Sequence, residues 1–246
     1  MNLNISIFLI FFILVGNVFS ADRALEEIAR KAILSSGYLT PEYLYISKDE
    51  NLKEEGKIFF ESKKLSLNGN ISCLTCHIAK KGSSDGIPNA AGIYGTGESG
   101  ERIKSGALIV PRNTLALWGV GSKGFETFFW DGRVDFSNEK NISQFGSHQP
   151  SEDPLITAVH LPVVEIRETL DEDSFVLKHK LESLGGAKNL FEAIVYKLKT
   201  EEKEAITSLA EKLNKTVVEI KFIDIARSLA SFIRNEFKLK STKFDK

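Results

Sequence analysis

The stretch Ser72–His77, with the sequence SCLTCH, contains both cysteines of this 246-residue chain. Two thiols separated by two residues can add across the two vinyl groups of one haem, and the adjacent imidazole can then bind the iron. We therefore predict one covalent haem c, with Cys73 and Cys76 as the attachment points and His77 as the proximal iron ligand.

Other roles for a Cys-x-x-Cys pair fit the rest of the sequence less well. A zinc site would need two more nitrogen or sulfur ligands, and the remaining histidines, His148, His160 and His179, are scattered. A thioredoxin-like redox pair is expected near a βαβ pattern, which is not visible here. A disulfide across two residues would close a very short loop and stabilise little. Haem attachment is the interpretation that the sequence favours.

The composition excludes several classes of protein. Hydrophobic residues make up 42% and charged residues 26%, which is typical of globular chains and not of disordered or collagen-like ones. Because 32 Lys and Arg nearly balance 33 Asp and Glu, the sequence offers no net positive charge for binding nucleic acid.

The first twenty residues are typical of an export signal. An apolar run from Ile7 ends at Asn17, so it is shorter than the roughly 20 residues that the alternative, an uncleaved membrane anchor, would need. We expect a signal peptide over residues 1–20, a periplasmic and soluble mature protein, and one haem domain over residues 21–246. Since Met1 is the one methionine of the chain, the mature protein would lack a methionine ligand for the iron. A distal histidine, another side chain or an open position remains.

Helical signals dominate, so the predicted fold class is mainly α, a cytochrome-c-like haem domain with long loops and added C-terminal helices. Ten of the eighteen glycines lie between Gly82 and Gly124, which predicts loops there. Apolar spacing predicts helices over residues 23–36, 171–184 and 190–199. A capping box of Thr216 and Glu219 precedes a last predicted helix that runs to Phe237.

The residues around the cysteine motif resemble, in order and approximate spacing, those of bacterial dihaem cytochrome c peroxidases. The matching stretches are Gly56-Lys-Ile-Phe-Phe60, Leu65-Ser66, Ser72–His77, Asp85-Gly86, Arg112-Asn113-Thr114 and Phe129-Trp130-Asp131-Gly132-Arg133. The resemblance covers roughly residues 25–245 and corresponds to the family's first domain, which houses the peroxide-binding haem. The relatives continue into a second haem domain, whereas this sequence stops at Lys246.

The resemblance implies roles for two further residues. Trp130 is similar to the tryptophan that the family places between its two haems as an electron-transfer bridge. Glu165 resembles the distal acid–base glutamate, with Ile166 where the family usually has methionine. A carboxylate with a raised pKa can take a proton from one peroxide oxygen and return it to the leaving oxygen. The alternative for Glu165 is a solvated loop carboxylate.

Departures from the family pattern concern the distal side of the haem and a cation. Ile93, followed by Tyr94, occupies the loop position of a histidine that blocks the resting site in some relatives. The resemblance therefore implies an open site, with His148 and His160 as possible substitute ligands. Asn113 is similar to an asparagine that helps bind Ca²⁺ between the family's domains, but the other Ca²⁺ ligands come from the second domain.

The resemblance implies a periplasmic haem protein that reduces hydrogen peroxide or uses it to oxidise a partner protein. Its expected partners are hydrogen peroxide and an electron donor or second haem protein. The alternative is a non-catalytic electron-transfer cytochrome c or redox sensor with a six-coordinate haem.

Overall fold

The computed structural model describes residues 23–138, 141–171, 173, 179, 184 and 188–242. The chain divides into a larger compact unit, Leu44–Lys240, and a smaller one that contains the described residues 23–43, 241 and 242. The predicted signal peptide and nearly all of the predicted helix over residues 171–184 lie outside the described residues. Within the described part, no helix is long and apolar enough to cross a membrane.

The smaller unit begins with a helix over residues 23–35, which confirms the helix predicted there. The helix ends where Gly37 adopts a φ of 85°, a conformation that glycine accepts at little cost. The short helix α2 (Pro41–Leu44) follows.

The larger unit is mainly helical, as predicted. Its helices are α3 (Lys53–Glu61), α4 (Cys73–Cys76), α5 (Gly100–Lys104), α6 (Pro154–Val159), α8 (Leu190–Glu201), α9 (Lys203–Lys212) and α10 (Phe222–Glu236). The 3₁₀ turns are η1 (Glu50–Leu52), η2 (Lys63–Leu65), η3 (Ala79–Lys81), η4 (Pro162–Val164) and η5 (Val217–Glu219). An antiparallel ribbon of β1 (Thr127–Phe128) and β2 (Val134–Asp135) pairs Thr127 with Asp135. The glycine-rich region forms long loops around η3 and α5, as predicted.

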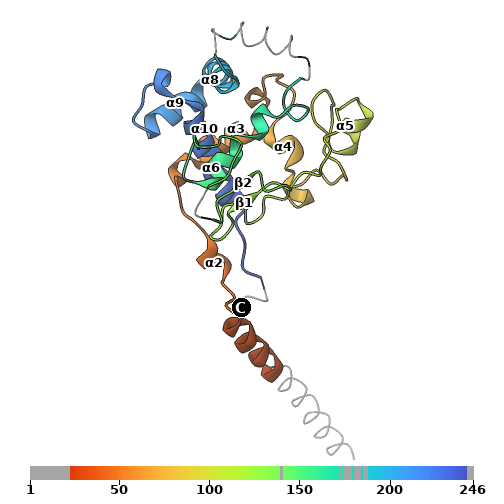
Figure 1. Ribbon diagram of the computed structural model, residues 1–246, viewed down its shortest axis with the longest axis vertical. Coiled ribbons are helices and arrows are strands. Elements are labelled where there is room, and N and C mark those ends of the chain that lie inside the picture. Colours follow the sequence, from red (N-terminus) through yellow and green to blue (C-terminus); the bar gives the residue numbers. More distant parts are fainter. Residues whose placement is uncertain are drawn as a thin grey trace, which may run out of the picture. The chain divides into compact units, whose positions relative to one another are not determined.

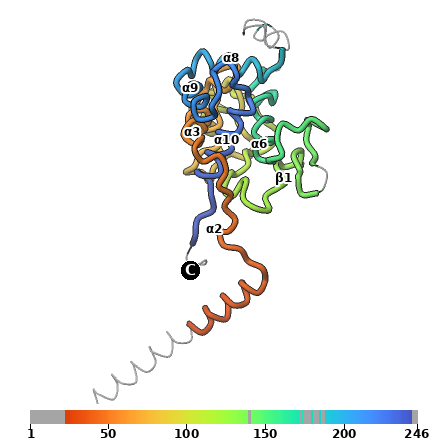
Figure 2. Tube along the Cα trace, turned by 90° about the vertical axis from the view of Figure 1, so that its left-hand side faces the viewer, coloured from red at the N-terminus to blue at the C-terminus, as the bar shows by residue number. Residues whose placement is uncertain are grey.

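Helix α10 is the central element of this unit. It packs against α3, α6 and α8, and Figures 1 and 2 show α8 and α9 on the side away from the β-ribbon. Ile225, Ala226, Leu229 and Ile233 recur at spacings of three and four and are at most 6% exposed. This apolar stripe supplies much of the core, because it faces several elements at once.

The start of α10 differs from the predicted start. The capping box of Thr216 and Glu219 is present, but it caps the 3₁₀ turn η5. Ile220 is extended, with a ψ of 126°, so the chain leaves the helical conformation before α10. The backbone N–H of Lys221 then donates to Asp224 Oδ2 at 3.0 Å, and the helix begins at Phe222.

Helices α3 and α10 cross at Gly56. A Cβ atom at this position would lie 1.9 Å from the backbone oxygen of Ser228 and 2.9 Å from the Cβ of Phe232. The near atom belongs to a helix backbone, so it cannot rotate away as a side chain would. The close crossing therefore requires glycine at position 56.

We predict that Gly56→Ala destabilises the protein by about 2 kcal/mol or more, because the added methyl group must push two packed helices apart. Urea unfolding followed by circular dichroism measures the loss. Gly100→Ala is the matched control, since a Cβ there meets nothing within 4 Å. Equal stability of the two variants would contradict the close crossing.

Candidate haem site

The cysteine motif forms a single helical turn, α4, that directs both thiols to one side. Its N-terminus is held by Ser72, whose backbone N–H donates to Thr75 Oγ1 at 2.9 Å. Residues three apart in a helix share a face, and both Cys73 and Cys76 line the same cavity. The two cysteines do not form a disulfide with each other.

The imidazole of His77 is oriented by the loop that follows α4. Its Nδ1 lies 3.0 Å from the backbone oxygen of Ser83, and a carbonyl oxygen can only accept, so Nδ1 carries the proton. Nε2 is therefore left unprotonated, as iron ligation requires. Burial lowers the pKa of His77, which also favours the neutral ring.

A cavity of about 340 Å³ lies beside the motif. Its walls are mostly apolar and come from segments far apart in the sequence: Phe60 from α3, Phe128 from β1, Leu155 from α6 and Leu229 from α10. A large apolar pocket with a few polar groups is typical of a cofactor site. Cysteines, histidine and apolar walls together fit a covalently attached haem.

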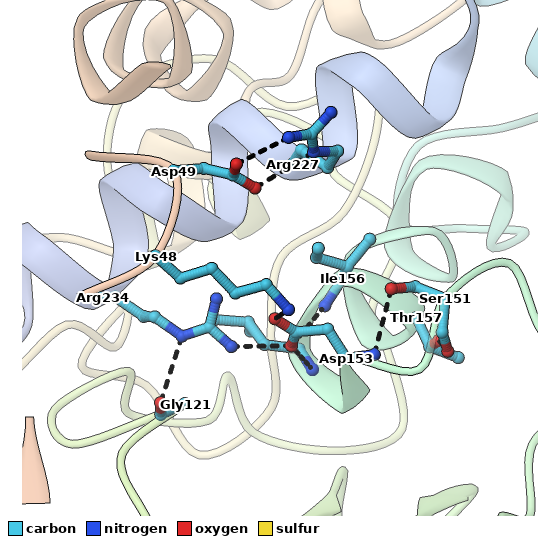
Figure 3. Close-up of polar contacts among 10 residues, drawn as sticks. Lys48, Asp49, Gly121, Ser151, Asp153, Ile156, Thr157, Arg227 and Arg234 are labelled. Carbon is cyan, nitrogen blue, oxygen red and sulfur yellow. Dashed lines mark hydrogen bonds and ion pairs between the residues drawn. The ribbon is translucent and has the colours of Figure 1, made fainter. Parts of the chain in front are cut away.

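The α6 wall of the cavity is fixed by a buried ion pair, which Figure 3 shows. Asp153 Oδ1 caps α6 by accepting from the backbone N–H of Leu155 at 3.0 Å. The same oxygen accepts from Arg234 Nη2 of α10 at 2.6 Å, and both side chains are at most 6% exposed. Lys48 reaches Asp153 Oδ2 at 2.9 Å from the surface. Burial alone would raise the pKa of Asp153, but the hydrogen bonds and charges of Arg234 and Lys48 outweigh it and lower the pKa.

A network of ion pairs lies along the polar part of the cavity. Asp131 accepts from Arg133 Nε at 3.0 Å and from Arg112 Nη1 at 2.7 Å. Hydrogen bonds from Arg133, then from Arg112, hold the pKa of Asp131 well below its usual range despite some desolvation. Arg133 Nη1 also lies 3.3 Å from Glu165 Oε2. This network thus places Glu165 in an ion pair on the cavity wall and not free in solvent.

Trp130 lies between the cavity and the surface. It lines the cavity, yet 62% of the residue is exposed. Its Nε1 donates to the backbone oxygen of Asn113 at 2.9 Å, and Asn113 Oδ1 accepts from Ser84 Oγ at 3.3 Å. The structure therefore brings Trp130 and Asn113 together at the cavity mouth.

Glu168 also lines the cavity, and it was not among the residues predicted for the site. It is only partly exposed, and burial, followed by the charge of Glu165, raises its pKa to about 7, although Arg133 opposes this shift. An acidic residue three positions after Glu165 is visible in the sequence, but its burial depends on contacts that the sequence does not display.

The two histidines considered as distal ligands lie elsewhere. His160 is 4% exposed, its Nδ1 is 2.7 Å from the backbone oxygen of Ile156, and its ring packs against Phe222 with centroids 5.0 Å apart. His148 is exposed beside Ser147. Among the described residues that line the cavity, His77 is the one histidine.

The residues at the loop position of the family's blocking histidine do not line the cavity. Ile93 is fully buried and does not line the cavity. The hydroxyl of Tyr94 donates to Asp171 Oδ1. Neither side chain is placed as a distal ligand in this structure.

The other roles of the cysteine pair gain no support from the structure. No group of three or more His, Cys, Asp and Glu side chains is placed to hold a metal ion within the described part of the chain. Burial raises the pKa of both thiols to about 12, whereas a redox-active cysteine needs a lowered pKa. The arrangement is that of a domain for covalently bound haem c.

Comparisons with known proteins agree with this class. Residues 51–246 match the family described as di-haem cytochrome c peroxidase. The methylamine utilization protein MauG of Methylorubrum extorquens is 31% identical over 124 residues, which cover 47% of this chain and 29% of that protein. The match thus spans less than a third of this relative's length.

The chain belongs to the di-haem cytochrome c peroxidase family. This confirms the predicted resemblance and the mainly α fold. The family binds haem c, so the cysteine motif and the cavity have a common explanation.

We predict that Asp153→Asn destabilises the protein by about 3 kcal/mol or more, because it leaves the buried Arg234 without its counter-charge. Asparagine still caps a helix, so the variant isolates the loss of charge. Chemical denaturation measures the effect. Lys48→Met is the control and should cost at most about 1 kcal/mol, since Lys48 is 47% exposed. Equal losses would contradict the importance of the buried pair.

Proposed function

We propose that this protein is a periplasmic haem c peroxidase that reduces hydrogen peroxide or uses it to oxidise a partner protein. The observation that carries the proposal is one cavity lined by Cys73, Cys76 and His77 together with Glu165. Bound haem would supply the iron that takes up peroxide and the electrons that cleave its O–O bond. The rest of the chemistry is proton movement by side chains.

In this proposal Cys73 and Cys76 hold the haem and His77 is the proximal ligand. The hydrogen bond from His77 Nδ1 to Ser83 fixes the ring and increases the electron donation of Nε2. His77 is the one histidine among the described lining residues, which supports an open position for peroxide on the other face of the iron. The six-coordinate electron carrier would need a second ligand, and the described lining of the cavity supplies no second histidine for it.

Glu165 is the proposed acid–base residue. It lines the cavity and accepts from Arg133, which is itself fixed by Asp131. The ion pair orients the carboxylate, so that it can accept a proton from peroxide. Arg133 is the positioning residue for this step.

Trp130 is the proposed route for electrons between the haem and a partner. Its indole lies on the cavity wall and 62% of the residue faces solvent. An aromatic side chain that touches both a cofactor site and the surface shortens the path to a docked protein. The partner would be a one-electron donor, a second haem protein, or the protein to be oxidised. Ca²⁺ forms no part of this proposal.

The exported holoprotein should carry one covalent haem and show a high-spin ferric spectrum that changes rapidly on addition of H₂O₂. Mass spectrometry and stopped-flow absorbance measure these properties. The double variant Cys73→Ala, Cys76→Ala is the control and should lose the covalent haem. A low-spin ferric spectrum that is inert to H₂O₂ would instead identify the electron carrier.

Glu165→Gln should slow the reaction with H₂O₂ about 100-fold or more, because general acid–base catalysis contributes at least this much. The haem should remain attached, which absorbance checks. Glu126→Gln is the matched control, since Glu126 is exposed and does not line the cavity. Unchanged kinetics in Glu165→Gln would refute the assignment.

A further inference from the structure

One short loop places two carboxylates, Glu165 and Glu168, on the same cavity. The backbone N–H groups of Thr169 and Leu170 both donate to the backbone oxygen of Glu165, at 3.1 and 3.3 Å. The N–H of Arg167 donates to the oxygen of Leu170 at 3.1 Å. These hydrogen bonds close the loop and fix the backbone from which the two glutamate side chains extend.

The backbone of this loop is strained at Arg167, and the same residue is hydrogen-bonded to a second loop. Arg167 has a φ of 72°, which costs energy for a residue with a side chain. Its backbone oxygen accepts from the N–H of Ile93 at 3.0 Å. A Cβ at Gly92 would lie 1.8 Å from the same oxygen, so the contact requires glycine there. Strain maintained by such contacts is typical of functional sites, and the residue that follows it is Glu168.

The two carboxylates have different surroundings. Glu165 forms an ion pair with Arg133 at 3.3 Å. Glu168 has no hydrogen bond or ion pair to any described side chain and faces a mostly apolar cavity. The charged and titratable groups that act on Glu168 are Glu165, Arg133 and Cys76. Burial and the nearby Glu165 raise the pKa of Glu168 to about 7. A carboxyl group whose pKa is raised by its surroundings serves as the proton donor in many active sites.

We propose that Glu168 is the proton donor for cleavage of the peroxide O–O bond, and that Glu165 is the proton acceptor in the same step. This inference rests on the proposed peroxidase function. It assigns to two residues the work that the resemblance gives to one.

The protons and electrons balance as follows. The carboxylate of Glu165 takes the proton from one peroxide oxygen, and the carboxylic acid of Glu168 gives its proton to the other. The O–O bond breaks, its electron pair leaves with the second oxygen, and that oxygen departs as water. The remaining oxygen becomes a second water with the proton from Glu165, one proton from solvent and two electrons. Solvent returns one proton to Glu168. The electrons come ultimately from one-electron donor proteins, so H₂O₂, two protons and two electrons give two waters.

The first test is the pH dependence of the stopped-flow reaction of the holoprotein with H₂O₂. Only the protonated form of Glu168 can donate, so the rate constant should fall as pH rises through about 7. In Glu168→Gln the rate constant should drop about 100-fold, and this decline should disappear. Glu168→Asp, which keeps a proton to donate, should retain the decline and part of the rate. Glu126→Gln should behave as the wild type.

The second test is infrared difference spectroscopy of the resting holoprotein, without peroxide. Between about pH 6 and pH 8, either side of the pKa of about 7, the wild type should lose the carbonyl band of a protonated carboxylic acid. In Glu165→Gln the band should be lost at a lower pH than in the wild type, because the charge of Glu165 no longer raises the pKa of Glu168. In Glu168→Gln this band should be absent. A structural role for Glu168 would not produce this pattern.

The outcomes separate this inference from the function on which it rests. If the wild type does not react with H₂O₂, both fail. If the wild type reacts while Glu168→Gln keeps the same rate and pH profile, only the role of Glu168 fails. Should Glu168→Gln not retain haem, Glu168→Asp and the wild-type infrared titration decide. Absence of the pH-dependent band in the wild type overturns the proposal.

Discussion

The close crossing of α3 and α10 at Gly56 is the constraint on which the rest of the structure depends. It places Phe60 of α3 and Leu229 of α10 on the same cavity. The cysteine motif follows α3 after a short connection, so the position of α3 also sets the position of α4. Helix α10 in turn holds α6 through the pair of Arg234 and Asp153. A methyl group at position 56 would therefore disturb three walls of the haem cavity at once.

Glu165 and Glu168 have the same side chain but different electrostatic environments, because of where the charged groups lie at the cavity. Arg133 forms ion pairs with Asp131 and Glu165, and this leaves Glu168 without a direct counter-charge among the described residues. Desolvation of an unpaired carboxylate favours its protonated form. One loop thus carries a carboxylate that is paired with Arg133 and an unpaired one whose pKa is raised to about 7. The positions of the nearby charges, more than the residue type, decide which glutamate is the proposed proton acceptor and which is the proposed proton donor.

The sequence predicted the elements whose signals are local. The helices over residues 23–36 and 190–199 and the glycine-rich loops are confirmed. The predicted start of the last helix is wrong, because Thr216 and Glu219 cap a separate 3₁₀ turn. The sequence left His160 as a possible substitute for the family's blocking histidine, whereas the structure packs His160 against Phe222 and outside the lining of the cavity. The roles of Glu165 and Trp130 stay predictions, supported by their places on the cavity wall.

The sequence by itself predicted haem attachment at Cys73 and Cys76 and iron ligation by His77, because this spacing within five residues is typical of covalent haem attachment. It also indicated the family, since short motifs in a fixed order survive without knowledge of their contacts. Only the tertiary structure decided which carboxylates share the cavity and how they differ. The loop that carries Glu168 is held by contacts between Gly92 and Arg167, which are 75 positions apart in the sequence. Burial and charge pairing across such separations are properties of the folded chain, which no local pattern encodes.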